Sequence, residues 1–479
     1  MLWICLLGIP LVGSFVTLSV KGSAAKSTAA VVAALEVLAF AAFLIGPKPT
    51  INLGWIATWG IRFHLAADGL ALFLLGLTAV MSLVAILASR SDYGRSYFFW
   101  ILFMEFASMG LFGAVDLFLF YIFWEVVLIP VFFLLTGWSG ERGRVAAIKW
   151  LIMNLFGSLF MLIGVVAVAV IYQQNTGHFS FEIGNLTHLA IAPAAQPWIF
   201  ACFALAFAIK APLWPFHGWM PDAYGEAPAP VTSLLAGVLS KAGVFGFLRV
   251  MLPIFAPELM HYRTGLLIWA VAGLVYGAFM AVRQRDMKMV TAYGSLSHMS
   301  MIALGIFSLT TAGILGATFL MVAHGLMMGG LFLIVGVVEE RVGHRDFNGL
   351  MGLNQGAPRL ATYFLFFALA ALGLPGLPGF AGEYMIIQGL VVHEVVFAII
   401  AGVVLVVAAW YMLRLFQGVM QGRPDAPAVS DLSRGQVGWL VPVALLVVVI
   451  GVWPAGITAH AVPSLFHAVH FVADQGGIK

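Results

Sequence analysis

Long apolar segments recur along almost the whole chain, and they constrain its fold more than any other feature. A helix needs about 20 apolar residues to cross the hydrocarbon core of a bilayer. Fourteen segments of the 479-residue chain meet this requirement and carry few charges. The sequence lacks the alternating ten-residue segments that are typical of membrane β-barrels. It therefore predicts an all-α polytopic membrane protein.

We expect about fourteen transmembrane helices, and the boundary between the fourth and fifth is marked only by Ala114 and Asp116. Their approximate limits are 3–20, 28–46, 67–89, 96–113, 115–137, 147–172, 198–216, 229–252, 265–283, 288–308, 312–338, 359–392, 394–419 and 437–460.

Composition supports this interpretation and excludes other classes of protein. The chain is 62% hydrophobic and 9% charged, whereas soluble domains are roughly 45–50% apolar and about 25% charged. Its net charge of +3 is small and scattered, so we expect the lipid bilayer, and no nucleic acid, as a partner. Cys5 and Cys202 lie in apolar runs without ligand spacing, which favours neither disulfides nor a metal or iron–sulfur site.

The distribution of basic residues predicts the orientation of the chain. Lys21 and Lys26 follow the first apolar segment, which indicates an uncleaved span and no secretory signal. Of the 23 Lys and Arg residues, sixteen fall in loops on the side opposite the N-terminus, five on the N-terminal side, and Lys210 and Lys241 inside spans. The positive-inside rule therefore places both termini on the outer side.

Two spans are interrupted by the same Pro-x-x-Pro pattern. Pro212 and Pro215 interrupt the seventh span, and Pro375 and Pro378 interrupt the twelfth. Proline removes a helical hydrogen bond, so such breaks persist in a bilayer only where protein or water satisfies the backbone. Paired breaks are typical of transporters built from inverted repeats. We therefore expect two inverted five-helix repeats, spans 4–8 and 9–13, although proline kinks are also common in membrane helices.

This organisation predicts a single membrane domain without a nucleotide-binding motif. We expect N-terminal helices 1–3 over 1–95, a first five-helix repeat over 96–252 with its break near 210–217, a second repeat over 265–419 with its break near 375–383, and a last helix with a short tail over 420–479.

A row of titratable residues falls near the middle of the predicted bilayer. Glu125 lies about 15 Å and Lys241 about 18 Å into its span, at 1.5 Å per residue. Four further residues fall at a similar depth or beside the breaks, namely Lys210, His298, His324 and Glu383. Charges within the membrane are costly and mark functional sites by default. A row at one depth indicates a path along the membrane plane.

Each of these residues also has a structural interpretation. Glu125 is a possible structural partner of a lysine, and Lys210 a possible ligand of the carbonyls that the break leaves free. Glu383 follows Gly382 and is expected to begin the second half-helix, where an acidic cap is favourable. The histidines fit the interpretation of satisfied core residues.

Five more titratable residues receive weaker assignments. We interpret His217, Asp222 and Lys149 as auxiliary, because the first two lie at the first break and the third opens the sixth span. Glu105 and Asp116 flank the turn between spans four and five and are interpreted as structural or auxiliary.

The chemistry of the row suits proton transfer. Histidine changes its protonation near neutral pH, and Glu and Lys exchange protons when burial and mutual charge adjust their proton affinities. A Glu–Lys pair then acts as a switch, because the lysine releases its proton when the partners separate.

The motifs around these residues resemble the antiporter-like proton-pumping subunits of respiratory complex I, the chain 4 family of NADH–quinone oxidoreductase. The resemblance covers roughly 95–420 and rests on FYIFWEVVLIP, AIKAPLWPFHGWMPDAYGEAPAP, LSKAGVFGFLR, DMKMVTAYGSLSHMS, VAHGLMMGGLF, RVGHRDFNGLMGL and LGLPGLPGFAGE. It implies that Glu125 and Lys210 form an input pair, that Lys241, His298 and His324 relay the proton, and that Glu383 completes the exit. L- and N-type members usually carry lysine at this last position, so Glu383 matches the M type.

The same resemblance implies a function, a cellular location and a set of partner subunits. The chain is expected to translocate protons in the bacterial inner membrane as a subunit of an oxidoreductase, with both termini periplasmic and with no redox centre or cofactor of its own. NADH, FMN, iron–sulfur clusters and quinone are then expected in partner subunits. The expected partners are the L- and N-type subunits and the small subunits of the membrane arm.

Several alternative functions remain open. The nearest are the D-type subunit of a multi-subunit sodium/proton antiporter and the pump subunit of a membrane-bound hydrogenase-type complex. A free-standing transporter of small solutes fits the broken helices. A b-type cytochrome would use His298 and His324 as haem ligands.

Overall fold

The structure is a computed structural model that describes residues 2–46, 50–187, 189–347, 350–422 and 429–462. Within this part of the chain, twelve helical segments are long and apolar enough to cross a membrane, when Leu117–Trp138 (α5 and α6) and Ala229–Ile254 (α11 to α13) are each counted as one segment. Two shorter apolar helices accompany them, α9 (Gln196–Lys210) and α18 (Pro358–Ala371). The prediction of an all-α polytopic membrane protein is confirmed. The count of fourteen spans and the inverted repeats stay predictions.

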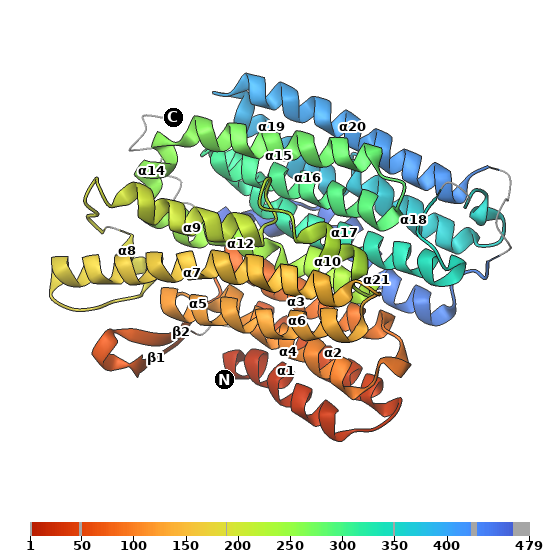
Figure 1. The fold of residues 1–479 in the computed structure, drawn as a ribbon, viewed down its shortest axis with the longest axis horizontal. Coiled ribbons are helices and arrows are strands. Elements are labelled where there is room, and N and C mark those ends of the chain that lie inside the picture. The colour runs from red at the N-terminus through yellow and green to blue at the C-terminus, as the bar shows by residue number, and fades with distance from the viewer. Residues whose placement is uncertain (1, 47–49, 188, 348–349, 423–428, 463–479) are drawn as a thin grey trace. The chain divides into compact units, whose positions relative to one another are not determined.

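The chain forms two compact units, and the first comprises residues 1–212, 239–263 and 460–479. Its long helices are α1 (Leu2–Ser19), α2 (Ala24–Ile45), α3 (Gly69–Ala88), α4 (Arg95–Gly113), α5 (Leu117–Val126), α6 (Leu128–Trp138), α7 (Gly143–Thr176) and α9. Its shorter elements are η1 (Ala57–Trp59), η2 (Ser91–Tyr93), α8 (Ile183–Leu186), α12 (Lys241–Gly246), η4 (Phe247–Met251), α13 (Leu252–Ile254) and α14 (Ala256–His261). Helix α1 packs against α2 and α4, which follow it in the red-to-orange part of the ribbon (Figure 1).

The second unit comprises residues 213–238 and 264–459. Its helices are α10 (Met220–Glu226), α11 (Ala229–Leu234), α15 (Arg263–Arg283), α16 (Met287–Phe307), α17 (Thr311–Val342), α18, α19 (Pro378–Val391), α20 (Val395–Met420) and α21 (Arg434–Val452), with the short η5 at Leu353–Gln355. Helix α17 is its centre, since it packs against α11, α16, α18, α19 and α21, and its apolar positions are buried almost throughout.

Polar residues in the loops fix where the membrane helices begin. The Asp116 side chain accepts hydrogen bonds from the amides of Phe118 and Leu119 at the start of α5, and Asp286 caps α16 in the same way. Ser433 forms a capping box with Gln436 at the start of α21. Such caps satisfy amide groups that a helix leaves unpaired at its N-terminus.

Both predicted breaks are present, and each divides a span into two shorter helices. In the first unit α9 ends at Lys210, and in the second unit α10 begins at Met220. The twelfth span is divided between α18 and α19, and Gly373 and Gly376 lie between them with φ of +79° and +91°. Left-handed backbone of this kind favours glycine because it has no Cβ.

A β-hairpin follows the second helix, and the sequence analysis did not predict it. Strand β1 (Ile51–Ile56) pairs antiparallel with β2 (Ile61–Leu65), and Ile51 lies opposite Leu65. Its first strand is largely exposed. The hairpin lies between two helices, in a segment to which the hydrophobic pattern assigned no secondary structure.

Candidate functional site

In the first unit, Lys210 ends α9 with a buried ammonium group. The side chain is 3% exposed, and within the described chain its Nζ atom has no hydrogen-bond partner. The ammonium instead lies 5.1 Å from the ring centre of Trp124 and 5.6 Å from that of Trp150. Aromatic faces stabilise a desolvated cation electrostatically. The sequence predicted a role for the lysine, but it gave no signal for the two tryptophans.

Glu125 directly follows Trp124 in α5 and is half-buried. Its carboxylate interacts electrostatically with Lys210, and it lies beside Tyr121 and Ser158. The expected Glu125–Lys210 pair is therefore present, with the two groups near each other but without a direct ion pair.

Lys241 occupies the interior of an unusual helix. It is fully buried, and its Nζ atom lies 3.3 Å from the Ser240 hydroxyl oxygen. Two π-helical segments flank it in sequence, η3 (Leu235–Leu239) and η4 (Phe247–Met251). Insertions of this kind concentrate at functional sites in helices. They divide the predicted span of 229–252, and its residue types did not indicate them.

In the second unit, His298 and Glu383 form a direct pair. The Nε2 atom of His298 lies 3.3 Å from Oε1 of Glu383, and both side chains are buried. The Nδ1 atom of His298 lies 3.0 Å from the Gly294 carbonyl oxygen. That contact assigns the proton to Nδ1, which leaves Nε2 facing the carboxyl group.

His324 adjoins this pair on α17. Its ring centre lies 5.5 Å from that of His298, and its Nε2 atom lies 3.3 Å from the Ser295 hydroxyl oxygen. His298, His324 and Glu383 thus come together from α16, α17 and α19. The three helices pack against one another, so the cluster is enclosed by helical surfaces.

The structure corrects the expected position of Glu383. We expected it to begin the second half-helix, but α19 begins at Pro378, and Glu383 lies in its second turn. Its carboxyl group is therefore no helix cap. Gly373 leaves space for it, because a Cβ atom at position 373 would meet Glu383 Oε2.

The auxiliary residues are less closely associated with these groups. His217 is buried in the turn before α10, with its ring centre 5.0 Å from that of Tyr276. Asp222 is exposed in the first turn of α10, and Lys149 is exposed on α7. The interpretation of Glu105 as a residue beside a turn was wrong, since it lies buried in the middle of α4.

Comparisons with known proteins identify the family of the chain. The family model described as "NADH:quinone oxidoreductase/Mrp antiporter, TM" matches residues 114–408. The chain belongs to this family. The resemblance to antiporter-like subunits of complex I is thereby confirmed.

Individual relatives of the family extend over most of the chain. It is 36% identical to the NADH-quinone oxidoreductase subunit M of Rickettsia prowazekii, over 84% of this chain and 82% of that protein. The Escherichia coli subunit M is 33% identical over 86% of this chain and 83% of its own length. A chain in the structure of respiratory complex I from Thermus thermophilus with bound NADH superposes with a TM-score of 0.91 at 30% identity, covering 98% of this chain and 100% of that one.

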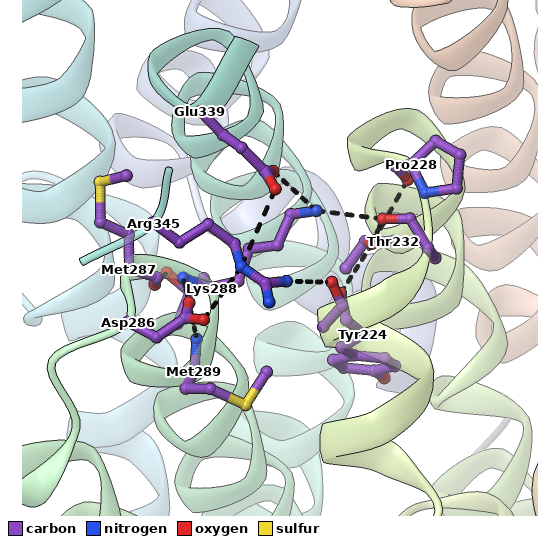
Figure 2. Close-up of polar contacts among 12 residues, drawn as sticks. Tyr224, Pro228, Thr232, Asp286, Met287, Lys288, Met289, Glu339 and Arg345 are labelled. Atoms are coloured by element: carbon purple, nitrogen blue, oxygen red, sulfur yellow. Dashed lines mark hydrogen bonds and ion pairs between the residues drawn. The ribbon is translucent and has the colours of Figure 1, made fainter. Parts of the chain in front are cut away.

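This member of the antiporter-like family also carries a polar cluster that the sequence analysis missed (Figure 2). The buried Lys288 forms an ion pair with Glu339 at 2.8 Å and donates to the Ala227 carbonyl at 3.1 Å. Arg345 pairs with Asp286 at 3.0 Å and donates to the Gly225 carbonyl. The cluster thus connects α16, α17 and the segment that follows the first break.

Two aspartates that cap helices, Asp116 at the start of α5 and Asp286 at the start of α16, have different environments. Burial raises the pKa of Asp116 to about 6, against the opposing effect of amide hydrogen bonds from Leu119, Arg62 and Phe118. Burial also raises the pKa of Asp286, although the Arg345 guanidinium opposes the shift. The sequence predicts neither of these two pKa shifts, because a pKa depends on the burial that tertiary packing creates.

Metal ligation receives no support from the geometry. In the residues that the structure describes, no group of three or more His, Cys, Asp and Glu side chains is placed to hold an ion.

Proposed function

We propose that this chain is the proton-translocating M-type subunit in the membrane arm of a respiratory NADH:quinone oxidoreductase. The similarity to subunit M proteins over more than four fifths of both chains supports this assignment. The observation that carries the proton-transfer role is the His298–Glu383 contact of 3.3 Å within apolar helices. The two groups are a base and an acid, and neither His298 Nε2 nor Glu383 Oε1 has a hydrogen-bond partner in the described chain. A small approach brings them within the roughly 2.6–3.2 Å at which a proton is transferred.

In the proposed relay, a proton enters at Glu125, whose charge stabilises the protonated Lys210. When the two groups separate, Lys210 loses this stabilisation and gives up its proton. Lys241, His298 and His324 carry the proton onward, and Glu383 delivers it to the exit. His298 acts within the second unit by accepting a proton at Nε2 and giving it to the Glu383 carboxylate, or the reverse.

The electron transfer that drives this relay takes place elsewhere in the proposed assembly. The chain is a subunit of an oxidoreductase complex by its relatives. We place NADH, FMN, iron–sulfur clusters and quinone in partner subunits, together with all redox centres. The L-type, N-type and small subunits are the proposed neighbours.

The relay is tested by substitution in the intact complex reconstituted into liposomes. Glu125→Gln and Lys241→Ala should abolish proton pumping while the complex still assembles. Glu141→Gln and Lys21→Ala are the controls, because both residues are exposed in loops. Normal pumping by either relay variant would overturn the assignment.

The alternatives are a D-type subunit of a multi-subunit sodium/proton antiporter and the pump subunit of a membrane-bound hydrogenase-type complex. Solved structures of an Mrp complex and of a membrane-bound sulfane sulfur reductase share the fold at 20% and 24% identity. Co-purification followed by identification of the subunits decides among them. Redox subunits that oxidise NADH support the proposal, and small antiporter subunits contradict it.

We further propose that the chain lies in the bacterial inner membrane with both termini periplasmic, and that 96–252 and 265–419 form the inverted repeats. A membrane-impermeant thiol reagent tests the orientation in a variant without Cys5 and Cys202. Applied from the periplasmic side, it should label Trp55→Cys in the exposed hairpin strand and leave Glu141→Cys unlabelled. The opposite pattern would reverse the orientation.

A further inference from the structure

Two buried carboxyl groups lie outside the proposed relay. Glu36 on α2 is 0% exposed, and Glu105 on α4 is 1% exposed. Within the described chain, none of their four carboxyl oxygens has a hydrogen-bond partner. The two groups interact electrostatically with each other. The proton path proposed above uses neither residue.

The packing of α1 against α2 shows which residue of α1 lies beside Glu36 along the helix axes. The Trp3 ring centre lies 5.3 Å from that of Phe43, and Gly13 packs closely against Val32. In this antiparallel register, residue 10 of α1 lies at the level of Glu36.

The packing of α1 against α4 shows which residue of α1 lies beside Glu105. Gly113 packs closely against Trp3, and the Phe15 ring centre lies 5.4 Å from that of Phe99. Residue 10 therefore lies at the level of Glu105 as well. Each of the three positions is near the middle of its helix, so this is the interior of the membrane.

Residue 10 is a proline inside α1. Proline has no amide hydrogen, and the carbonyl four residues earlier, that of Leu6, loses its helical donor. A hydrogen-bond acceptor without its usual partner thus lies one turn from the level of the two carboxyl groups. A protonated carboxyl group is a donor that suits it.

In the part of the chain that the structure describes, no cation acts electrostatically on Glu105. The titratable residues on the helices packed around them are Cys5 on α1, Lys26 on α2, Asp92 and Tyr93 on η2, Arg95 and Tyr97 on α4, Tyr121 and Glu125 on α5, and Lys241 on α12. Helices α3 and α6 contribute none. Among the described groups, Glu36 is the one that acts electrostatically on Glu105.

Two ionised carboxylates are therefore excluded on physical grounds. Like charges at one buried site cannot both ionise without a large cost, and an unpaired charge inside a membrane costs several kcal/mol more. We propose that Glu36 and Glu105 form a second proton-binding site, in which the two carboxyl groups hold at least one proton at neutral pH. The proton bridges one carboxyl oxygen to the other group or to the Leu6 carbonyl.

This site lies at the depth of the relay but on other helices. The ring centres of Phe106 and Phe123 are 5.8 Å apart, so Glu105 on α4 and Glu125 on α5 lie at about the same level. Glu125 interacts electrostatically with Lys210, whereas Glu105 interacts electrostatically with Glu36. Helix α4 therefore separates a carboxyl–lysine site from a carboxyl–carboxyl site.

Infrared spectroscopy of the intact complex tests the proposal directly. The carbonyl stretching band of protonated carboxyl groups should lose intensity in Glu36→Gln/Glu105→Gln at neutral pH and should be unchanged in Glu141→Gln. A double variant with the full wild-type band would overturn the proposal, because both groups would then be ionised in the wild type.

A second measurement uses the wild-type complex and needs no variant to fold. A hydrophobic carbodiimide adds to a protonated carboxyl group, whose proton moves to a carbodiimide nitrogen, and an oxygen-to-nitrogen acyl shift then gives a stable acylurea. Peptide mass spectrometry should find this adduct on Glu36 or Glu105 and not on the exposed Glu141. Adducts on neither buried residue would contradict the proposal.

A comparison of two salts distinguishes a bound proton from a bound sodium ion. If the carboxylates held a metal cation in place of a proton, sodium chloride would raise the thermal stability of the wild-type complex relative to choline chloride, and the double variant would lose that effect. We expect no difference between the two salts. A sodium-dependent shift confined to the wild type would overturn the assignment of a proton.

Discussion

The two units hold the titratable groups of the proposed relay in different ways. In the first unit, the Lys210 ammonium faces the rings of Trp124 and Trp150, and its carboxyl partner Glu125 stands nearby without a direct ion pair. In the second unit, His298 contacts Glu383 at 3.3 Å.

This difference has a physical consequence. A cation that contacts aromatic faces without a direct ion pair depends on the nearby carboxylate for part of its stabilisation, so it gives up its proton when that carboxylate moves away. This suits the switch at the entry of a relay. An imidazole that lies 3.3 Å from a carboxyl group needs only a small approach to exchange a proton, which suits the exit. The following predictions test this contrast, from the largest expected effect on pumping to the smallest.

Breaking the direct pair should have the largest effect. In Glu383→Gln the amide cannot accept a proton from His298, and removal of a positioned acid or base slows proton transfer by about 100-fold or more. Pumping by the reconstituted complex should fall accordingly, and Glu141→Gln should pump normally. Wild-type pumping by Glu383→Gln would show that the 3.3 Å contact is only structural.

Removing an aromatic face from the first unit should have an intermediate effect. Trp124→Leu removes one of the two rings at Lys210, and a desolvated cation–π contact contributes about 0.5–2 kcal/mol. We expect pumping to decrease by about three- to tenfold. Trp410→Leu is the matched control, because this tryptophan is 59% exposed on α20. Equal pumping by both variants would refute a role for the ring.

Two glycines at the second break separate backbone strain from displacement of Glu383. Both have positive φ, so alanine at either position should cost about 1–2 kcal/mol of stability. Only at Gly373 would the new Cβ also meet the Glu383 carboxyl group, whereas the surroundings of Gly376 are open. Gly373→Ala should therefore lower pumping a few-fold more than Gly376→Ala, with similar melting temperatures. Indistinguishable pumping rates would contradict the proposed fit between Gly373 and Glu383.

The loop aspartates should affect the pH dependence of stability and leave pumping almost unchanged. The pKa of Asp116 rises to about 6 on folding, so the folded state binds its proton more tightly than the unfolded state. The stability that this protonation contributes is present below about pH 4 and is lost as the pH rises to about 6. A shift of about two units corresponds to about 3 kcal/mol.

Asp116→Asn should remove this dependence, so its melting temperature should change less than that of the wild type between pH 4 and pH 7. Asp286→Asn provides the comparison in the second unit, because Arg345 opposes the shift there. The change in slope should be smaller for this variant. The same slope for wild type and Asp116→Asn would show that burial does not control this carboxyl group.

The sequence alone predicted much of the candidate site. Glu125, Lys210, Lys241, His298, His324 and Glu383 stood out because a charge or imidazole within an apolar span has few structural explanations. The two breaks followed from their prolines. The pair of indole rings around Lys210 was beyond such reasoning, since Trp124 and Trp150 are unremarkable aromatic residues in apolar helices until packing brings them together.

Other features were decided only by the tertiary structure. Glu36 and Glu105 lie 69 positions apart in sequence, and nothing local distinguishes a carboxylate with a partner from one without. The Lys288–Glu339 pair likewise joins residues from two helices. The π-helical segments beside Lys241 depend on a local shift of the hydrogen-bond register that residue type does not specify.

The sequence by itself determined that the chain spans a membrane, which residues are too costly to bury without a function, and where its helices break. These properties follow from one-dimensional patterns of hydropathy, charge and proline. The tertiary structure decided which charge meets which partner. Distances between side chains depend on helix rotation and register, and these are set by packing between segments that are remote along the chain.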